Sequence, residues 1–91
     1  MSKTHNLKTR PEHFRDVLLS IKKAELRRAD RDFAVGDSLC LNEYGESEHD
    51  ANLVGFTGAF IFVRITHITD VSEWAPGYVM LSIERRQASA T

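Results

Sequence analysis

The sequence predicts a small α+β domain, a mostly antiparallel β-barrel or rolled sheet with one main N-terminal helix packed beside it. Several segments alternate apolar and polar residues, which is the period of a strand, and one segment near the N-terminus has the period of a helix. One helix is too few for the crossovers of a parallel βαβ sheet. A barrel would also remove the exposed edges of an open five-stranded sheet.

The chain length fits one domain. We assign all 91 residues to a single domain, 1–91, and expect order over about 4–85 with a flexible tail at 86–91. No apolar stretch approaches the roughly 18 residues of a membrane span, and no signal peptide is visible. The single cysteine, Cys40, excludes an internal disulfide and favours a cytoplasmic location. We read this thiol as inert.

The first expected elements are a short strand and the helix. Residues 5–9 are weakly typical of a strand, and Pro11 then opens a helix at the position where its missing N–H costs nothing. Thr9 is the candidate N-cap, because arginine at position 10 caps poorly. The helix is expected to reach about Ser20. Its inward face follows the i, i+3, i+4, i+7 spacing of Phe14, Val17, Leu18 and Ile21.

A second strand and a turn are expected next. Residues 24–28 alternate, so Leu26 should point inward and Glu25 and Arg27 should share the other face. Residues 30–36 form a charged turn. Its expected apolar plugs are Phe33 and Val35.

Three longer strands complete the expected sheet, at 38–44, 58–68 and 78–84, with an acidic mobile loop at 45–56. The glycine-bracketed piece Gly55-Phe56-Thr57-Gly58 is expected at a bulge or strand entry. The residues assigned to the inward faces are Leu39, Leu41, Ile61, Val63, Ile65, Val79, Leu81 and Ile83.

The formal net charge of −1 conceals a strong asymmetry along the chain. Residues 1–31 carry nine basic side chains against four acidic ones, whereas residues 32–84 carry one basic side chain against nine acidic ones. Such a distribution can create a local positive field at near-neutral total charge. Scattering and mutual pairing of these charges on the folded surface is the alternative.

The junction between the helix and the second strand holds the main candidate site. Glu25 and Arg27 lie two apart on a strand and project to one face, with Lys22 close to the helix end. A carboxylate between two cations would stay ionised. The trio could bind a base edge or ribose through Glu25 and a phosphate through Lys22 or Arg27. An ordinary surface ion-pair strip is the alternative.

Further candidate ligand residues come from the same basic segment and from the strand ends. Lys8 and Arg31 could add phosphate contacts, although Arg31 could instead clamp the turn to the barrel. Tyr44 and Tyr78 could stack on a base at a barrel mouth. Phe60 or Phe62 is more simply explained by core packing. No cofactor motif or metal-ligand spacing is present in the sequence, so we expect no cofactor and no metal.

Several ordered sequence pieces together resemble a known family. They are His5-Asn6-Leu7-Lys8, Pro11-Glu12-His13-Phe14, Lys22 with Glu25-Leu26-Arg27, Asp30-Arg31-Asp32-Phe33, Val35-Gly36-Asp37, Glu43-Tyr44, Phe56-Thr57-Gly58 and Gly77-Tyr78-Val79-Met80-Leu81-Ser82-Ile83. From His5 to Glu84 the chain resembles a small bacterial and phage branch of the ASCH domains, in the PUA-like superfamily. The resemblance implies a pseudo-barrel of five or six strands with a helix beside it. It also implies a cleft by that helix for RNA or nucleotides.

Some ASCH relatives resemble amidohydrolases that act on acetylated cytidine. Their motif is matched here by Lys22 and Arg27, but Glu25 stands where the family has a catalytic threonine. A carboxylate is not an alkoxide nucleophile, so the threonine mechanism does not carry over. Glu84 is offered as the distant acid of that motif. Ala59 stands where relatives often have a basic residue.

Three functions remain open from the sequence, and whether the protein is an enzyme is uncertain. The first is a module that binds RNA or a nucleotide through Lys8, Lys22, Glu25, Arg27, Arg31, Tyr44 and Tyr78. The second is a small hydrolase of a modified nucleoside, with Glu25 as general base and Lys22 stabilising the developing charge. The third is a phage or bacterial accessory factor that docks another protein through the acidic segment or the 45–56 loop.

Overall fold

The computed structural model describes residues 2–46 and 53–86. Within these residues the strands form one five-stranded sheet in the order β1-β3-β4-β5-β2, and one short helix accompanies it. This confirms a small, mostly β architecture with one helix. The elements are β1 (Thr4–Thr9), α1 (Pro11–Leu18), β2 (Ala24–Arg28), β3 (Ser38–Glu46), β4 (Val54–Asp70) and β5 (Tyr78–Arg85).

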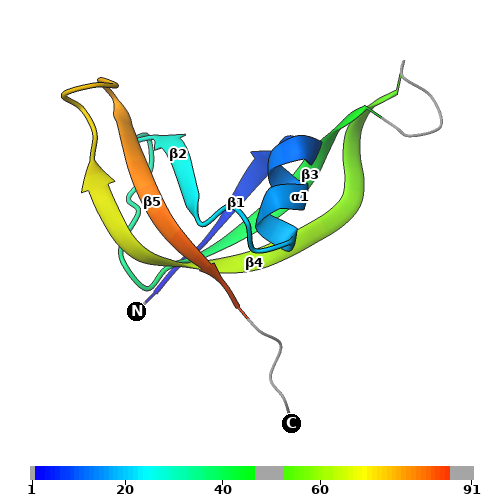
Figure 1. The fold of residues 1–91 in the computed structure, drawn as a ribbon, viewed down its shortest axis with the longest axis horizontal. Coiled ribbons are helices and arrows are strands. Elements are labelled where there is room, and N and C mark those ends of the chain that lie inside the picture. Colours follow the sequence, from blue (N-terminus) through cyan, green and yellow to red (C-terminus); the bar gives the residue numbers. More distant parts are fainter. Residues whose placement is uncertain (1, 47–52, 87–91) are drawn as a thin grey trace, which may run out of the picture.

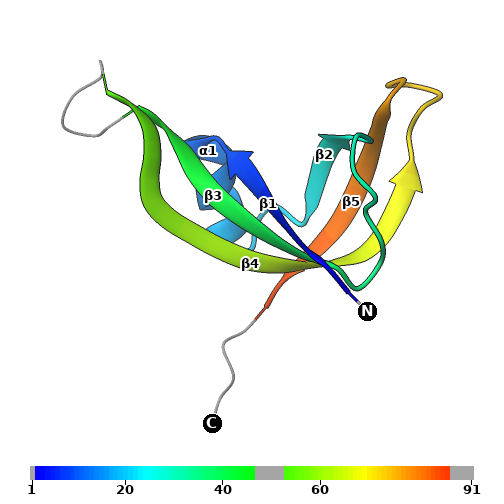
Figure 2. The same cartoon turned by 180° about the vertical axis from the view of Figure 1, so that it is seen from behind.

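The sheet is a half-barrel. β3, β4 and β5 pair antiparallel in sequence order, β2 pairs antiparallel with β5, and β1 runs parallel to β3. Figure 1 shows the sheet bent into a trough, with β2 and β5 on one arm, β1 and β3 on the other, and α1 inside. Figure 2 shows the same trough from behind. β1 and β2 are the two end strands of the sheet and do not pair with each other through their backbones. The sheet is therefore rolled, as one form of the prediction had it, and is not a closed barrel.

The core lies on the concave face, between the sheet and α1. The alternation predicted for the three long strands is confirmed, because the same residues of β3, β4 and β5 point inward. β1 adds Leu7, and α1 adds Phe14 and Val17. The buried residues of the long strands are Leu39, Leu41, Ile61, Val63, Ile65, Leu81 and Ile83, with Val79 packed against them.

The helix differs from the prediction at both ends. Arg10 occupies the N-cap position without a side-chain cap hydrogen bond, whereas Thr9 is the last, buried residue of β1. The helix ends at Leu18, because Ser20 takes a left-handed conformation (φ 60°) that turns the chain toward β2. Leu18 and Ile21 were therefore wrongly assigned to the inward face, and both are exposed.

The faces of β2 are the reverse of the prediction. Glu25 is buried, with 3% exposure, whereas Leu26 is 48% exposed. Glu25 and Arg27 do share a face, but it is the concave one, where ion pairs satisfy the carboxylate. In the following turn Phe33 packs against the core as predicted, whereas Val35 is exposed.

The β3–β4 hairpin extends well into the segment expected to be an acidic loop. Gly45 and Glu46 belong to β3, and Val54 to Phe56 belong to β4. Residues 47–52, where most of that loop was placed, lie outside the described residues. The bulge expected in the glycine-bracketed piece is confirmed by the φ of 92° at Gly58 and by the register shift opposite Asn42 and Tyr44.

A close approach between α1 and β3 yields a first prediction. A Cβ on Gly45 would lie 2.6 Å from Cγ and 2.7 Å from Cδ of Pro11, the first helical residue. Gly45→Ala should therefore push the start of α1 off the sheet and lower the free energy of unfolding by about 1–3 kcal/mol. Urea unfolding followed by circular dichroism measures this. Gly55, its partner in register, has open space around its Cα, so an equal loss in Gly55→Ala would contradict the prediction.

The C-terminal end of β5 runs one residue further than expected, to Arg85, and that end is tied down. Arg85 Nη1 donates a hydrogen bond to the Leu18 carbonyl at 2.9 Å, and Arg86 Nη1 donates to Ser38 Oγ at 2.9 Å. Residues 87–91 of the expected tail lie outside the described residues. Within the described part of the chain, no helix is long and apolar enough to cross a membrane.

Candidate functional site

The candidate site lies where α1 and β2 meet the end of β1. Five residues separate the last residue of α1 from the first of β2, and the backbone amides of Ile21 and Lys22 both bond to the Asp16 carbonyl. This tight turn brings the Lys22 side chain beside Glu25. The sequence predicts this meeting from the place of Lys22 near the helix end, just before the strand that carries Glu25 and Arg27.

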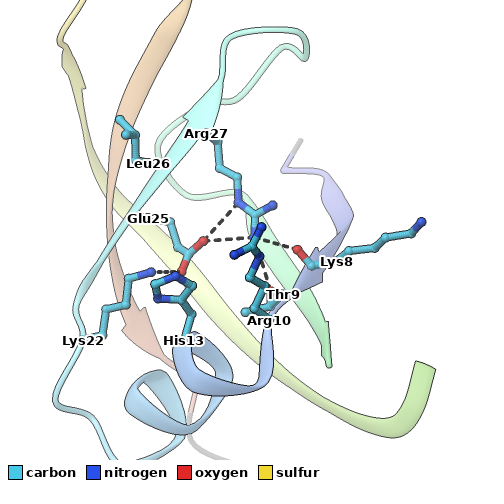
Figure 3. Close-up of a pocket in the computed structure, with 8 residues that line it drawn as sticks. All are labelled: Lys8, Thr9, Arg10, His13, Lys22, Glu25, Leu26 and Arg27. Carbon is cyan, nitrogen blue, oxygen red and sulfur yellow. Dashed lines mark hydrogen bonds and ion pairs between the residues drawn. The ribbon is translucent and has the colours of Figure 1, made fainter. Parts of the chain in front are cut away.

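Glu25 is the centre of a buried ion-pair cluster. Its Oε1 accepts a hydrogen bond from Lys22 Nζ at 2.8 Å, and its Oε2 accepts one from Arg27 Nε at 3.0 Å (Figure 3). The carboxylate side chain is 4% exposed, whereas the two cations are each about a quarter exposed. Glu25 therefore holds two cations in fixed positions while their outer sides stay open to solvent.

Arg27 joins the two free edges of the half-barrel. Besides its contact with Glu25, its Nη2 donates to the Lys8 carbonyl at 3.0 Å and to Thr9 Oγ1 at 3.3 Å. Lys8 and Thr9 belong to β1, so side-chain hydrogen bonds replace a backbone ladder between β1 and β2. The rigid fork of a guanidinium suits this bridge better than a lysine would.

A pocket of about 450 Å³ opens over this cluster, which is within the range of small-ligand sites. Its wall includes Arg10 and His13 from the start of α1, so three cationic side chains, Arg10, Lys22 and Arg27, face one carboxylate. Its lining residues are Lys8, Thr9, Arg10, His13, Lys22, Glu25, Leu26 and Arg27 (Figure 3). The uncapped N-terminal turn of α1 adds a positive dipole end.

A smaller hollow of about 180 Å³ continues along the same seam. Arg27 lines both hollows, and Arg31 Nη1 donates to the Asn6 carbonyl of β1 at 2.9 Å, as the clamp interpretation predicted. Three arginines thus line this hollow, with Asp30 as its one acid. Its lining residues are Leu7, Arg27, Arg28, Asp30, Arg31 and Phe33.

Comparison with known proteins places the chain in a family. A model described as a domain of unknown function, DUF3850, matches residues 4–83. The chain belongs to the DUF3850 family. A relative that is 38% identical over 81 residues is an uncharacterised 12.9 kDa protein in the GpA 3′ region of Escherichia phage P2, and the match covers 89% of this chain and 68% of that protein. All residues of both hollows lie inside the matched range.

The remaining predicted ligand residues lie elsewhere in the DUF3850 domain. Lys8 contributes its carbonyl to the pocket edge, while its Nζ lies 4.6 Å from the ring centre of Tyr44, on the convex face. Tyr78 pairs with Arg28 on β2, on the face opposite Glu25. Glu84 is exposed and pairs with Arg64 at 2.6 Å. The pocket therefore unites Lys22, Glu25 and Arg27 but neither tyrosine.

Sequence reasoning assigned four of the eight lining residues to the site and missed Thr9, Arg10, His13 and Leu26. Arg10 and His13 are the two of these with an ionisable side chain. From the sequence, Arg10 is only a poor N-cap and His13 is only a member of the piece Pro11-Glu12-His13-Phe14. The available signal was their position in the first turn of a helix that follows an edge strand, within the basic segment. Both side chains project from that turn toward the same opening as Lys22.

A second buried pair, His5 and Asp37, was also missed, and it is structural. Asp37 Oδ1 accepts the Lys3 amide at 2.9 Å, while Oδ2 accepts the Ala34 amide at 3.0 Å and lies 2.8 Å from His5 Nε2. The Lys3 amide, then the His5 ring, holds the pKa of Asp37 below its ordinary value. In the described part of the domain no three His, Cys, Asp or Glu side chains gather as metal ligands.

The arrangement in the pocket is suited to anion binding. Both Glu25 oxygens already accept hydrogen bonds from cations, so Glu25 acts here as an anchor for Lys22 and Arg27. The Arg10 carbonyl accepts the Phe14 amide at 2.8 Å, but its guanidinium makes no hydrogen bond or ion pair with another described residue. An incoming phosphate can therefore meet this guanidinium together with the outer sides of Lys22 and Arg27.

Proposed function

We propose that this DUF3850 domain binds RNA or a nucleotide, as an ASCH-type, PUA-like module, through the pocket at the junction of α1 and β2. The proposal rests on one observation: three cations, Arg10, Lys22 and Arg27, surround a buried carboxylate at the uncapped start of a helix. Cations and helix amides together are a common phosphate-binding arrangement. The half-barrel with a helix in its trough is compatible with this class. The single free cysteine favours a cytoplasmic setting.

The acidic remainder of the chain supports a small ligand over long duplex. Acids such as Glu46, Glu73 and Glu84 lie outside the β1–β2 seam and would repel a long duplex laid across the whole surface. The basic side chains concentrate along the β1–β2 seam. A nucleotide or a short RNA segment can reach the seam without crossing the acidic surface.

Hydrolysis is the weaker proposal for the same pocket. A general base needs a free lone pair directed at a substrate proton. Glu25 is buried, and each of its two oxygens already accepts a hydrogen bond from a cation, so neither is directed at a substrate proton. The same contacts strengthen the binding proposal, because they fix the cations in place.

Arg10→Ala should weaken binding of a labelled short RNA, and of a nucleoside monophosphate, roughly tenfold, because one charge-assisted contact to phosphate is lost. Fluorescence anisotropy at about 50 and 200 mM salt measures this, and affinity should fall with salt for the wild type and less steeply for the variant.

Arg15→Ala is the matched control for that experiment. Arg15 is an exposed arginine of the same helix outside the pocket lining, so its loss changes net charge equally. If both variants weakened RNA binding equally, the effect of Arg10→Ala would come from the change in net charge and not from a contact in the pocket. Absence of binding to any phosphate ligand by the wild type would remove the proposal.

A further inference from the structure

A strip of aromatic side chains lies exposed on the convex face, on the side of the sheet opposite the core. Phe56 is 62% exposed and Phe60 is 56% exposed, and Phe62 is also exposed. The expectation that Phe60 or Phe62 packs in the core is therefore wrong. In register, Phe56, Phe60 and Phe62 lie opposite Tyr44, Asn42 and Cys40 of β3. We call Tyr44, Phe56, Phe60 and Phe62 the aromatic face.

The rings of the aromatic face contact one another in pairs, and the ammonium group of Lys8 lies over two of them. Tyr44 and Phe56 meet edge to face with centroids 5.0 Å apart, and Phe60 and Phe62 do so at 5.8 Å. Lys8 Nζ lies 4.6 Å from the Tyr44 centroid and 5.8 Å from that of Phe56. On β1 and β3 the outward positions beside Phe60 and Phe62 carry Asn6, Lys8, Cys40 and Asn42, and none of these is acidic. Glu46 follows Tyr44 on the same face of β3 and bounds the strip at its other end.

The aromatic face adjoins the pocket across one edge strand. Lys8 links the two surfaces, because its carbonyl accepts the Arg27 hydrogen bond at the pocket edge while its ammonium lies over the aromatic face. β1 is the end strand of the sheet, so no further strand separates them on that side.

We propose that the aromatic face binds the bases of a single-stranded nucleic acid whose phosphate occupies the pocket. This inference rests on the proposed function of the pocket and extends it from one nucleotide to several. Exposed aromatic rings bind bases by stacking, which needs unpaired bases and excludes a duplex. Lys8 supplies the charge that a backbone phosphate between stacked bases needs. A nucleic acid satisfies both the rings and the cation, whereas a symmetric second copy of the chain would bring a second, repelling Lys8.

The test compares uridine monophosphate with a labelled oligouridylate of about ten nucleotides, in RNA and DNA forms. The wild type should bind the oligomer more tightly than the monophosphate. The double variant Phe56→Leu, Phe60→Leu keeps apolar surface but loses the aromatic rings. We expect it to bind the oligomer about fivefold or more weakly and the monophosphate unchanged. Trp74→Leu, an exposed aromatic between β4 and β5, is the matched control and should change neither affinity.

Several results would overturn the inference and leave the pocket intact. The first is that the wild type binds the oligomer no more tightly than the monophosphate. The second is that the double variant binds the oligomer as tightly as the wild type does. The third is that light scattering shows a dimer of the wild-type protein that the double variant does not form. Failure of both ligands to bind the wild type would instead remove the proposed function together with the inference. Tighter binding of the RNA than of the DNA oligomer would support RNA as the strand, and equal binding would support either single strand.

Discussion

Replacing Asp37 by alanine is expected to lower the free energy of unfolding by about 3–5 kcal/mol. Asp37 is 2% exposed and accepts hydrogen bonds from the amides of Lys3 and Ala34 and from the His5 ring. Alanine would leave two backbone donors and a buried ring nitrogen without partners. These contacts fix the start of β1 against the turn before β3, so the loss spreads to both strands. Urea unfolding monitored by circular dichroism measures the change.

The same residue makes stability depend on pH in acid. The pKa of Asp37 is lowered in the folded state from an ordinary value of 3.8, chiefly by the Lys3 amide and then by the His5 ring. The folded protein therefore binds this proton more weakly than the unfolded chain. The stabilisation is complete well above the ordinary value of 3.8, from about pH 5 upward, and is lost as the pH falls through the lower, folded-state pKa. Asp37→Asn should flatten this part of the profile.

Asp70→Asn is the control for the pH profile. The Ser72 hydroxyl and amide also lower the pKa of Asp70, which is exposed, so it contributes in the same direction. An acid-side loss that persists in Asp37→Asn and disappears in Asp70→Asn would assign the effect to Asp70. An Asp37→Ala protein as stable as the wild type would contradict the buried network itself.

The second large effect is expected at Glu25. Glu25→Ala should cost about 2–3 kcal/mol, less than a fully buried ion pair because Lys22 and Arg27 can reach solvent. For a domain of this size that loss corresponds to a fall in Tm of the order of 10–20 °C. Arg27 would also lose the contact that orients it toward Lys8, so the seam between β1 and β2 would loosen.

Glu84→Ala is the control for Glu25→Ala, because it removes an ion pair that is exposed and not buried. Glu84 pairs with Arg64 at 2.6 Å, but both side chains are about half exposed, so its removal should cost less than about 1 kcal/mol. Glu25→Gln keeps the size of the side chain and should fall between the two variants. Equal melting temperatures for Glu25→Ala and Glu84→Ala would show that burial adds nothing to the Glu25 cluster.

The long strands were predictable from the sequence because one physical cause decides their faces. In β3, β4 and β5 the apolar residues alternate, and burial against α1 selects the apolar side. The position of Pro11 at the helix start was predictable for a similarly local reason. The parallel pairing of β1 with β3 was not, since the hydrophobic period of a strand does not identify its neighbour.

The site was predictable in its members but not in its orientation. Spacing alone brought Lys22, Glu25 and Arg27 together, and the structure shows these contacts. The rule that leucine points inward then failed at Leu26, because two cations and the β1 edge make the inner face of β2 polar. Likewise, the apolar character of Phe60 suggested a core position, but no described element covers the convex face on which Phe60 lies.

A free strand edge is a template on which another chain can add a strand, which is a common route to aggregation. β1 is such an edge, because it is an end strand of the sheet. Its contacts with β2, the other end strand, are made by side chains and not by a backbone ladder. The carbonyls of Asn6 and Lys8 are occupied by the guanidinium groups of Arg31 and Arg27. A guanidinium cannot continue a backbone ladder, so the arginines of the pocket also protect a half-open barrel from polymerising with its own copies.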